Sequence, residues 1–326
     1  MPYRTTPLVQ RLSNQLQASH ALLFGPAATD AYAVVQQVAQ MALSAIARTD
    51  AAYHDVEHTL LVTTVGLEIL HGKHLLEAAI TPTEWTNFTV ALLCHDIGYL
   101  KGICAADDPA QHRYATGLGE GLVAIAPTAT DASLTPYHVD RGKAFVAANL
   151  MAYPAVDLEQ VQQLIEMTRF PVPQDAAHQA TQTWGGLARA ADLIGQLSDR
   201  QYLDKLPALF QEFTETGAHL ALNYRQVQDL RAGYPAFFWG VVQPLILPAT
   251  RYLQATRQGQ VTLANLYRNV AIVEQEIAPQ PAGDRETLLD ATGRHHTYLH
   301  DAPQTGATPE DSAFFDPAAA LRINRV

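Results

Sequence analysis

Apolar residues recur every three to four positions along most of the chain, which is the period of a helix with one buried face. Residues 31–48 and 53–71 follow this pattern, and the Thr-Pro-Thr-Glu sequence at 81–84 predicts the capped start of another helix. Further helices are expected over residues 138–150, 158–168, 183–197, 203–214, 220–230 and 263–277. Because no segment alternates apolar and polar residues as a half-buried strand does, the sequence predicts an all-α fold.

The same pattern divides the chain into three parts. Residues 1–29 are expected to form an N-terminal extension, residues 30–278 a helical domain, and residues 279–326 a loosely attached C-terminal tail. Within the domain, residues 102–136 have no sustained period and are predicted to form a long irregular excursion. Long loops of this kind are often functional.

Composition and charge restrict the classes of partner. With 48% hydrophobic and 16% charged residues, the chain can bury a sizeable core, which excludes a disordered protein. Its net charge of −11 and its lack of a dense basic run argue against binding to extended nucleic acid or to an anionic membrane. The two cysteines cannot form a disulfide framework and the N-terminus does not resemble a signal peptide, so a cytoplasmic location is expected. The oligomeric state does not follow from the sequence.

One uncharged stretch, between Arg231 and Arg251, approaches the ~20 residues that a membrane-spanning helix needs. Pro235, Pro244 and Pro248 interrupt this stretch, and proline breaks the hydrogen-bond pattern inside a helix. We therefore expect two short buried helices here and no membrane span.

The pair His95-Asp96 is the first candidate for chemistry. It lies inside the apolar run 90–100, where two ionisable groups cost desolvation energy unless they are paired or bound to a metal. Taken singly, a buried His or Asp is more often a hydrogen-bonded core residue. The pair gains meaning only if further metal-binding side chains join it.

Three further residues could do so. His54 and His58 are four residues apart on a predicted helix and therefore share one face, and Asp192 lies in another apolar helix. Two imidazoles and two carboxylates suit Zn²⁺, Mn²⁺ or Fe²⁺ better than Ca²⁺. One carboxylate can also bridge to a second, more hydrated cation such as Mg²⁺ or Mn²⁺. The joint arrangement favours a site for two divalent metal ions.

The order of these motifs resembles the HD superfamily of metal-dependent phosphohydrolases, and within it the class I cyclic-nucleotide phosphodiesterase-like catalytic domain. Residues 53–58, Tyr-His-Asp-Val-Glu-His, are similar to the family's Tyr-His-Asn-x-x-His, and His95-Asp96 matches the pair that names the superfamily. Residues 190–193, Ala-Ala-Asp-Leu, resemble Cys-Ala-Asp-Leu. Residues 237–245 resemble a terminal Phe-Ile-x-x-Ile-Val-x-Pro-Leu segment.

The resemblance, which covers roughly residues 30–270, implies a role for each matched residue. The first metal ion would be held by His58, His95, Asp96 and Asp192. Asp96 would bridge to the second ion, and His54 would be the general acid that protonates the departing alkoxide while a metal-bound hydroxide attacks phosphorus. The implied activity is hydrolysis of a small-molecule phosphoester, a phosphodiester or nucleotide.

The substrate side of the site departs from the family pattern. Tyr234 occupies the place of a purine-reading glutamine, whereas Phe237 keeps the aromatic residue that clamps the base, so the resemblance does not extend to purine specificity. His138 is a candidate substrate-binding residue. Arg141 is a candidate for binding the substrate phosphate, with a solvated surface charge as the alternative.

The acidic partner expected for the general acid His54 also differs from the family pattern. Thr135 stands where the family has the glutamate of Leu-Glu-Asn-His-His, and threonine cannot replace a carboxylate partner for His54. Another acid, Asp55 or one in the 102–136 excursion, would have to keep His54 protonated.

Two other classes of function stay open at this point. A diiron oxygenase could be built on the same fold, because His/Asp clusters also bind iron, and additional ligands such as His112 or His138 would favour it. A non-catalytic metal-binding or nucleotide-binding regulatory module is the third interpretation. The intact set of candidate ligands argues against this third interpretation.

Overall fold

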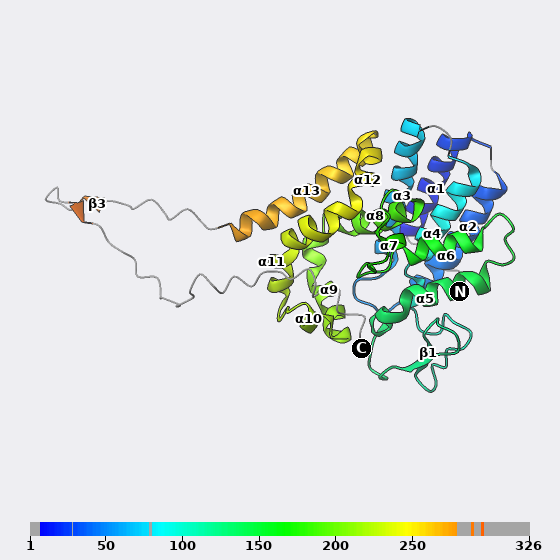
Figure 1. The fold of residues 1–326 in the computed structure, drawn as a ribbon, viewed down its shortest axis with the longest axis horizontal. Helices are drawn as coiled ribbons and strands as arrows, with labels where there is room; N and C mark the ends of the chain where they lie inside the picture. Colours follow the sequence, from blue (N-terminus) through cyan, green and yellow to red (C-terminus); the bar gives the residue numbers. More distant parts are fainter. Residues whose placement is uncertain (1–6, 28, 78–79, 279–287, 290–294, 297–326) are drawn as a thin grey trace.

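The structure is a computed structural model that describes residues 7–27, 29–77, 80–278, 288–289 and 295–296, and this part of the chain is all-α with short strand pairs (Figure 1). Its helices are α1 (Pro7–Phe24), α2 (Asp30–Ile46), α3 (Val56–Glu77), α4 (Pro82–Cys94), η1 (Ile97–Tyr99), η2 (Asp131–Tyr137), α5 (His138–Asn149), α6 (Leu158–Glu166), α7 (Ala176–Gln179), α8 (Trp184–Leu197), α9 (Tyr202–Thr216), α10 (Ala218–Ala221), α11 (Val227–Phe237), η3 (Phe238–Val242), α12 (Gln243–Gln254) and α13 (Arg257–Ile277). The strands are β1 (Arg113–Ala115), β2 (Leu122–Ala124), β3 (Leu288–Leu289) and β4 (His295–His296). Apart from β3 and β4, which pair antiparallel, the expected tail lies outside the described residues.

Helices α3 and α8 cross in the centre of the fold. Helix α3 packs against α1, α4, α8 and α12, and α8 also contacts α6 and α12. Gly195 of α8 lies against the backbone of α3, because a Cβ atom built on it would be 2.7 Å from Cα of Val62. The missing side chain lets the two helices approach closely. His58 lies one turn before Val62 and Asp192 one turn before Gly195, so the crossing brings these two candidate ligands together.

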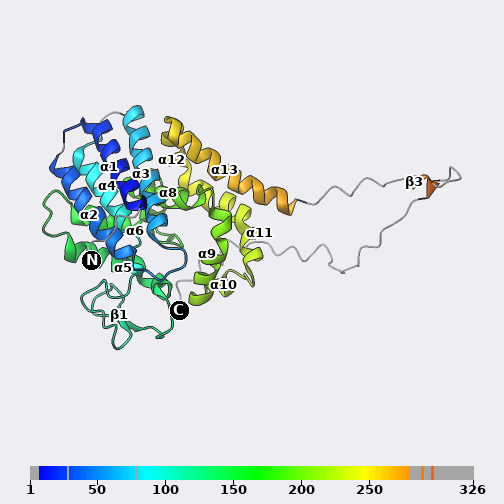
Figure 2. The ribbon, with the colours of Figure 1, turned by 180° about the vertical axis from the view of Figure 1, so that it is seen from behind.

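The segment before residue 30 is part of the helical core and not an extension. Helix α1 packs against α2 and α3, and Leu12 and Leu16 are fully buried there. The indole nitrogen of Trp85, in α4, donates to the hydroxyl of Ser19 at 3.1 Å. Residues 7–24 therefore belong to the domain that the sequence pattern placed at residues 30–278, as the two views of the ribbon show (Figure 2).

Local sequence explains where several helices begin. The side chain of Thr29 accepts from the backbone N–H of Tyr32 and caps α2, and the predicted capping box at Thr81 and Glu84 is present at the start of α4. Helix α3 begins later than its apolar period suggested. The Asp55 carboxylate accepts hydrogen bonds from the backbone N–H groups that follow it and ends the preceding loop, so the helix starts at Val56.

The excursion at 102–136 contains regular structure that the sequence pattern did not show. Strands β1 and β2 form an antiparallel hairpin, and η2 follows them. Both strands are only three residues long, too short for an alternation to be recognised. Near the start of the excursion, the buried carboxylate of Asp107 receives two hydrogen bonds from Arg141 of α5, which ties the loop to the helical core.

The uncharged stretch between Arg231 and Arg251 forms helices α11 and α12, as expected, but the π-helical turn η3 joins them without a break. Pro235 lies in α11 and Pro248 lies in α12. Within the part of the chain that the structure describes, no helix has both the length and the apolar character needed to cross a bilayer.

Candidate metal centre

Four ionisable side chains from three parts of the fold meet at one point. His58 lies in the first turn of α3, His95 and Asp96 follow the end of α4, and Asp192 lies in α8. The Nε2 atoms of His58 and His95 are 3.3 Å apart. Oδ2 of Asp96 lies 3.1 and 3.2 Å from these two nitrogens, and Oδ1 of Asp192 lies 3.5 and 3.6 Å from them. The structure thus brings together the four residues that the sequence suggested as ligands.

The cluster fits a divalent metal ion. Atoms that bind one ion at ~2.0–2.2 Å lie ~3.0–3.6 Å from one another when the bond angles are ~90–110°, and the separations above fall in this range. Oδ2 of Asp96 is buried and has no hydrogen-bond partner among the described residues, which is costly for a carboxylate oxygen unless it binds a cation. Two overlapping groups, His58 with His95 and Asp192, and His54 with His58 and Asp96, could hold a metal ion.

A backbone hydrogen bond orients the ring of His95 toward the cluster. Its Nδ1 atom donates to the carbonyl oxygen of Leu92 at 2.8 Å, and because a carbonyl can only accept, the neutral ring must present the lone pair of Nε2 to the cluster. Burial lowers the pKa of His95, but the carboxylates of Asp96 and Asp192 outweigh this effect and raise the pKa well above its usual value. The two buried carboxylates therefore require positive charge, which protons or a bound cation can supply.

His54 is held in a different way. It lies in the loop before α3, so the prediction that His54 and His58 share a helical face is wrong. Its Nδ1 atom donates to Oε2 of Glu212 at 2.5 Å, and Oε1 of the same carboxylate accepts from the backbone N–H groups of Tyr53 and His54 at 2.6 and 3.2 Å. Burial lowers the pKa of His54, but the charge and hydrogen bond of buried Glu212 outweigh burial and raise this pKa to about 9. The carboxylate of Glu212 therefore favours the protonated form of the imidazole.

The acid that keeps His54 protonated comes from α9. The sequence suggested Asp55 or an acid of the 102–136 excursion, but the Asp55 carboxylate caps α3 instead. Glu212 follows Leu206 and Leu209 at helical spacing on the buried face of α9. An acidic residue on an otherwise apolar helix face is the local feature of the sequence that could have identified Glu212.

An aromatic stack supports the same side of the site. The ring of Tyr99, in η1, is stacked between the rings of His54 and His138, with centroid distances of 4.5 and 4.4 Å. Nδ1 of His138 donates to the carbonyl oxygen of Thr135 at 2.6 Å, and Nε2 lies 3.9 Å from Oδ1 of Asp96. Burial lowers the pKa of His138, so its ring is neutral and presents a lone pair toward Asp96. No motif or apolar period pointed to Tyr99.

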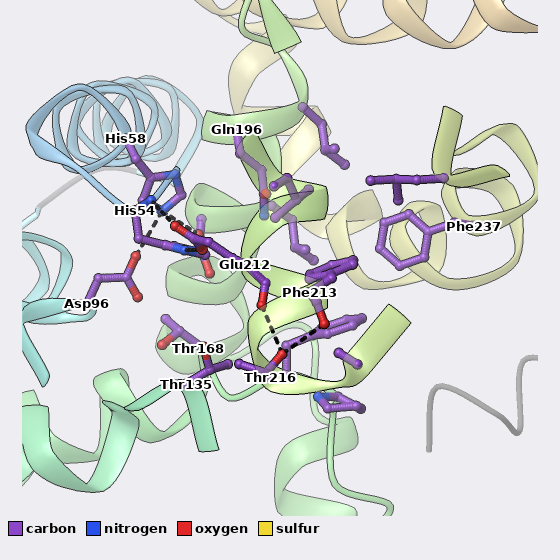
Figure 3. A pocket seen from close by; sticks show the side chains of 18 of the residues that line it. His54, His58, Asp96, Thr135, Thr168, Gln196, Glu212, Phe213, Thr216 and Phe237 are labelled. Atoms are coloured by element: carbon purple, nitrogen blue, oxygen red, sulfur yellow. Dashed lines mark hydrogen bonds and ion pairs between the residues drawn. The ribbon is translucent and has the colours of Figure 1, made fainter. Parts of the chain in front are cut away.

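A cavity of about 220 Å³ adjoins the cluster. His54, His58 and Asp96 lie on one side of the view and Phe237 on the other, with Glu212 and Phe213 between them (Figure 3). Of the suggested substrate-binding residues, His138, Tyr234 and Phe237 line the cavity.

Arg141 does not line this cavity, and its suggested role in phosphate binding is wrong. Its side chain is fully buried, and its guanidinium donates to three backbone carbonyls and to Asp107. These bonds use all five N–H groups, so none is free for a substrate. His112, a suggested extra ligand, is also absent from the residues that line the cavity.

The fold and the cluster define an all-α protein whose histidine and aspartate side chains could hold a metal ion beside a mainly apolar cavity. The chain belongs to the Npun_R2479-like family, whose model matches residues 3–276. The match includes helix α1 and ends within α13. A search of the curated proteins found no match.

Proposed function

We propose that the protein is a metal-dependent hydrolase of a small-molecule phosphoester, with His58, His95, Asp96 and Asp192 as ligands and His54 as general acid. A divalent ion held by these four residues would supply Lewis-acid chemistry and lower the pKa of a bound water. The second ion, bridged through Asp96, is part of the same proposal. The proposal is supported by the resemblance of the sequence motifs to those of the phosphohydrolases and by the histidine and aspartate atoms of the cluster, which are typical metal ligands.

One observation carries the proposal: the imidazole of His54, whose Nδ1 atom donates to the buried carboxylate of Glu212, lies beside the cluster of candidate ligands. Glu212 binds Nδ1 of His54 and holds its charge, which leaves Nε2 as the atom that can donate a proton toward the cavity. A departing alkoxide needs such a proton, because alkoxides are strong bases in water. The separate hydrogen bonds of Glu212 to the backbone of residues 53 and 54 fix the orientation of this donor.

The test begins with metal analysis of the purified full chain, followed by assays of phosphomonoesters and phosphodiesters with Mn²⁺, Mg²⁺ or Zn²⁺ added. The proposal expects bound metal and turnover that a chelator abolishes and added metal restores. Metal binding without turnover of any phosphoester, under every metal condition, would contradict the hydrolase and favour a binding module.

A diiron oxygenase is the second candidate, and the neutral ring of His138 favours it. Nε2 of His138 is 3.9 Å from Oδ1 of Asp96, where a histidine could become an additional ligand. Oxygen consumption by the Fe²⁺-loaded protein, lost in His138→Ala, would support this candidate. Phosphoester turnover that is unaffected by His138→Ala would argue against it.

A further inference from the structure

The cavity beside the candidate metal centre has two chemically different parts. Next to the cluster it is lined by imidazole and carboxylate groups, whereas its remaining wall is formed mainly by apolar side chains of α8, α9 and α11. Leu193 and Leu197 come from α8, Leu209 and Phe213 from α9, and Leu230 and Phe237 from α11. Figure 3 shows Phe237 on the opposite side from His58 and Asp96, with Phe213 between them.

The apolar part of the cavity offers no free positive charge. Among the described lining residues, Arg189 is the only lysine or arginine, and its guanidinium is 1% exposed. Nε of Arg189 donates to the carbonyl oxygen of Met167 at 2.8 Å, and Nη1 donates to that of His178 at 2.7 Å. The arginine is thus committed to backbone carbonyls. A second anionic group on a ligand, away from the cluster, would be desolvated without compensation.

Recognition of a nucleobase also has little support along this wall. Base edges are read by side chains with paired donors and acceptors, for which the amides of Asn and Gln are the usual choice. Of the described lining residues, Gln196 is the one amide, and its Oε1 atom already lies 3.5 Å from the hydroxyl of Tyr53, which donates to it. Tyr234 is 2% exposed, so its hydroxyl is not open to a ligand.

We infer that the substrate carries a single phosphoryl group on an apolar alkyl or aryl group, and is not a nucleoside di- or triphosphate. The phosphoryl end would meet the metal cluster and His54, so this part rests on the proposed function. The organic group would lie against Leu193, Phe213 and Phe237. Burial of each methylene in an apolar site strengthens binding by ~4-fold, which sets the size of the expected preference.

The first experiment uses the Mn²⁺-loaded full chain and a series of alkyl phosphates, as monoesters and as methyl diesters, with methyl, butyl or hexyl groups. Leaving-group basicity changes little along this series, so kcat/KM reports mainly the apolar contact. We expect kcat/KM to rise at least ~10-fold from methyl to hexyl, given partial burial of the chain. AMP and ATP should be poorer substrates than the hexyl ester. Equal kcat/KM along the series, or a preference for ATP, would overturn the inference.

A matched pair of variants tests whether the apolar wall of the cavity causes the preference for longer alkyl groups. Phe237→Ala should remove most of the advantage of hexyl over methyl, because it shortens the apolar surface without touching a candidate ligand. Tyr267→Ala, which truncates a partly exposed aromatic residue of α13 outside the cavity, should keep the advantage. Loss of the advantage in both variants, or in neither, would overturn the inference.

Binding of phosphonates, which cannot be hydrolysed, separates this inference from the proposed function. Calorimetry compares methylphosphonate with hexylphosphonate on the Mn²⁺-loaded chain, and hexylphosphonate should bind at least ~10-fold more tightly. If no ester is hydrolysed but this difference appears and depends on Phe237, the reaction is wrong and the ligand class stands. If esters are hydrolysed without dependence on chain length and the phosphonates bind equally, the function stands and the ligand class is wrong.

Discussion

Glu212 of α9 binds His54, which lies 158 positions earlier in the chain, with Oε2 of the carboxylate 2.5 Å from Nδ1 of the imidazole. The same carboxylate accepts the backbone N–H of His54 and of Tyr53, so one buried acid fixes both the charge and the position of the histidine. In the proposed reaction His54 must be protonated to act. The pair would therefore set the alkaline limit of the proposed reaction.

Replacement of Glu212 by Gln should shift the alkaline limit of activity to lower pH. The folded-state pKa of His54 is raised to about 9, so the active, protonated form is lost as the pH rises through about 9. Without the carboxylate charge this pKa should fall toward the usual ~6.5, and kcat/KM at pH 8 should fall ~10-fold or more. The measurement is kcat/KM against pH for both proteins. Glu215→Gln is the control, because Glu215 lies one turn later in α9 and binds Thr130 instead.

The same pair has a predicted effect on stability. A histidine whose pKa is raised on folding stabilises the protein fully below its unfolded pKa of ~6.5, and this contribution is lost as the pH rises through about 9. Urea unfolding of the metal-free protein at pH 6 and pH 9.5 should therefore show a larger loss of stability for the wild type than for Glu212→Gln. An unchanged alkaline limit and an unchanged pH dependence in the variant would contradict the role of Glu212.

His58→Ala and His54→Asn should separate metal binding from acid catalysis. Loss of His58 removes a ligand nitrogen, so we expect metal affinity to fall at least ~100-fold and activity to fall with it. His54→Asn should retain metal and lose ~10²–10⁴-fold in turnover of alkyl esters, with a much smaller loss for an activated aryl phosphodiester that departs without a proton. Metal content by mass spectrometry and turnover of the two substrate types give the comparison. Metal loss in His54→Asn would make His54 a ligand, and equal losses on both substrates would refute its role as an acid.

Arg141 should matter for stability and not for substrate binding. Arg141→Ala removes the cationic partner of the buried Asp107 carboxylate and a donor from each of three backbone carbonyls, and breaking a buried ion pair costs ~3–5 kcal/mol of unfolding free energy. Arg251→Ala is the matched control, since Arg251 is 57% exposed in its pair with Glu77 and should contribute ~0–1 kcal/mol. Denaturant unfolding measures the free energy of unfolding of both variants. A stable Arg141→Ala protein with a raised KM would restore the phosphate-binding interpretation.

Gly195→Ala should weaken the metal site from a distance. The added Cβ would lie 2.7 Å from Cα of Val62, so α8 must move away from α3, at a cost of ~1–3 kcal/mol. This movement separates Asp192 from His58, and metal affinity should fall although no ligand is changed. Gly240→Ala is the control, because no described atom lies within 4 Å of a Cβ built at Gly240. The measurements are the unfolding free energy and the metal affinity of both variants. Wild-type values of both quantities in Gly195→Ala would contradict the prediction.

Part of this site could be predicted because it depends on local sequence. The helical period, the cap at Thr81, and the apolar surroundings of His95 and Asp96 are all properties of short segments. An ionisable group inside an apolar run must find a partner, whatever the rest of the fold, because desolvation of a charge is expensive. His95, Asp96 and Asp192 were therefore identifiable from their apolar surroundings, whereas His58 was suggested by the resemblance of the 53–58 motif, and the structure brings the four together.

The tertiary structure alone decided which partner each of these groups meets. A helical period reports which face of a helix is buried, but not which distant helix covers that face. Packing of α9 brings Glu212 to His54, whereas the sequence suggested Asp55 or an acid of the 102–136 excursion for this role. Tertiary contacts also stack Tyr99 of η1 between two histidines and enclose Arg141, for which the sequence suggested phosphate binding. The physical reason is the close approach of elements far apart in the chain, as at Gly195 and Val62, where a single Cβ atom decides whether the helices meet.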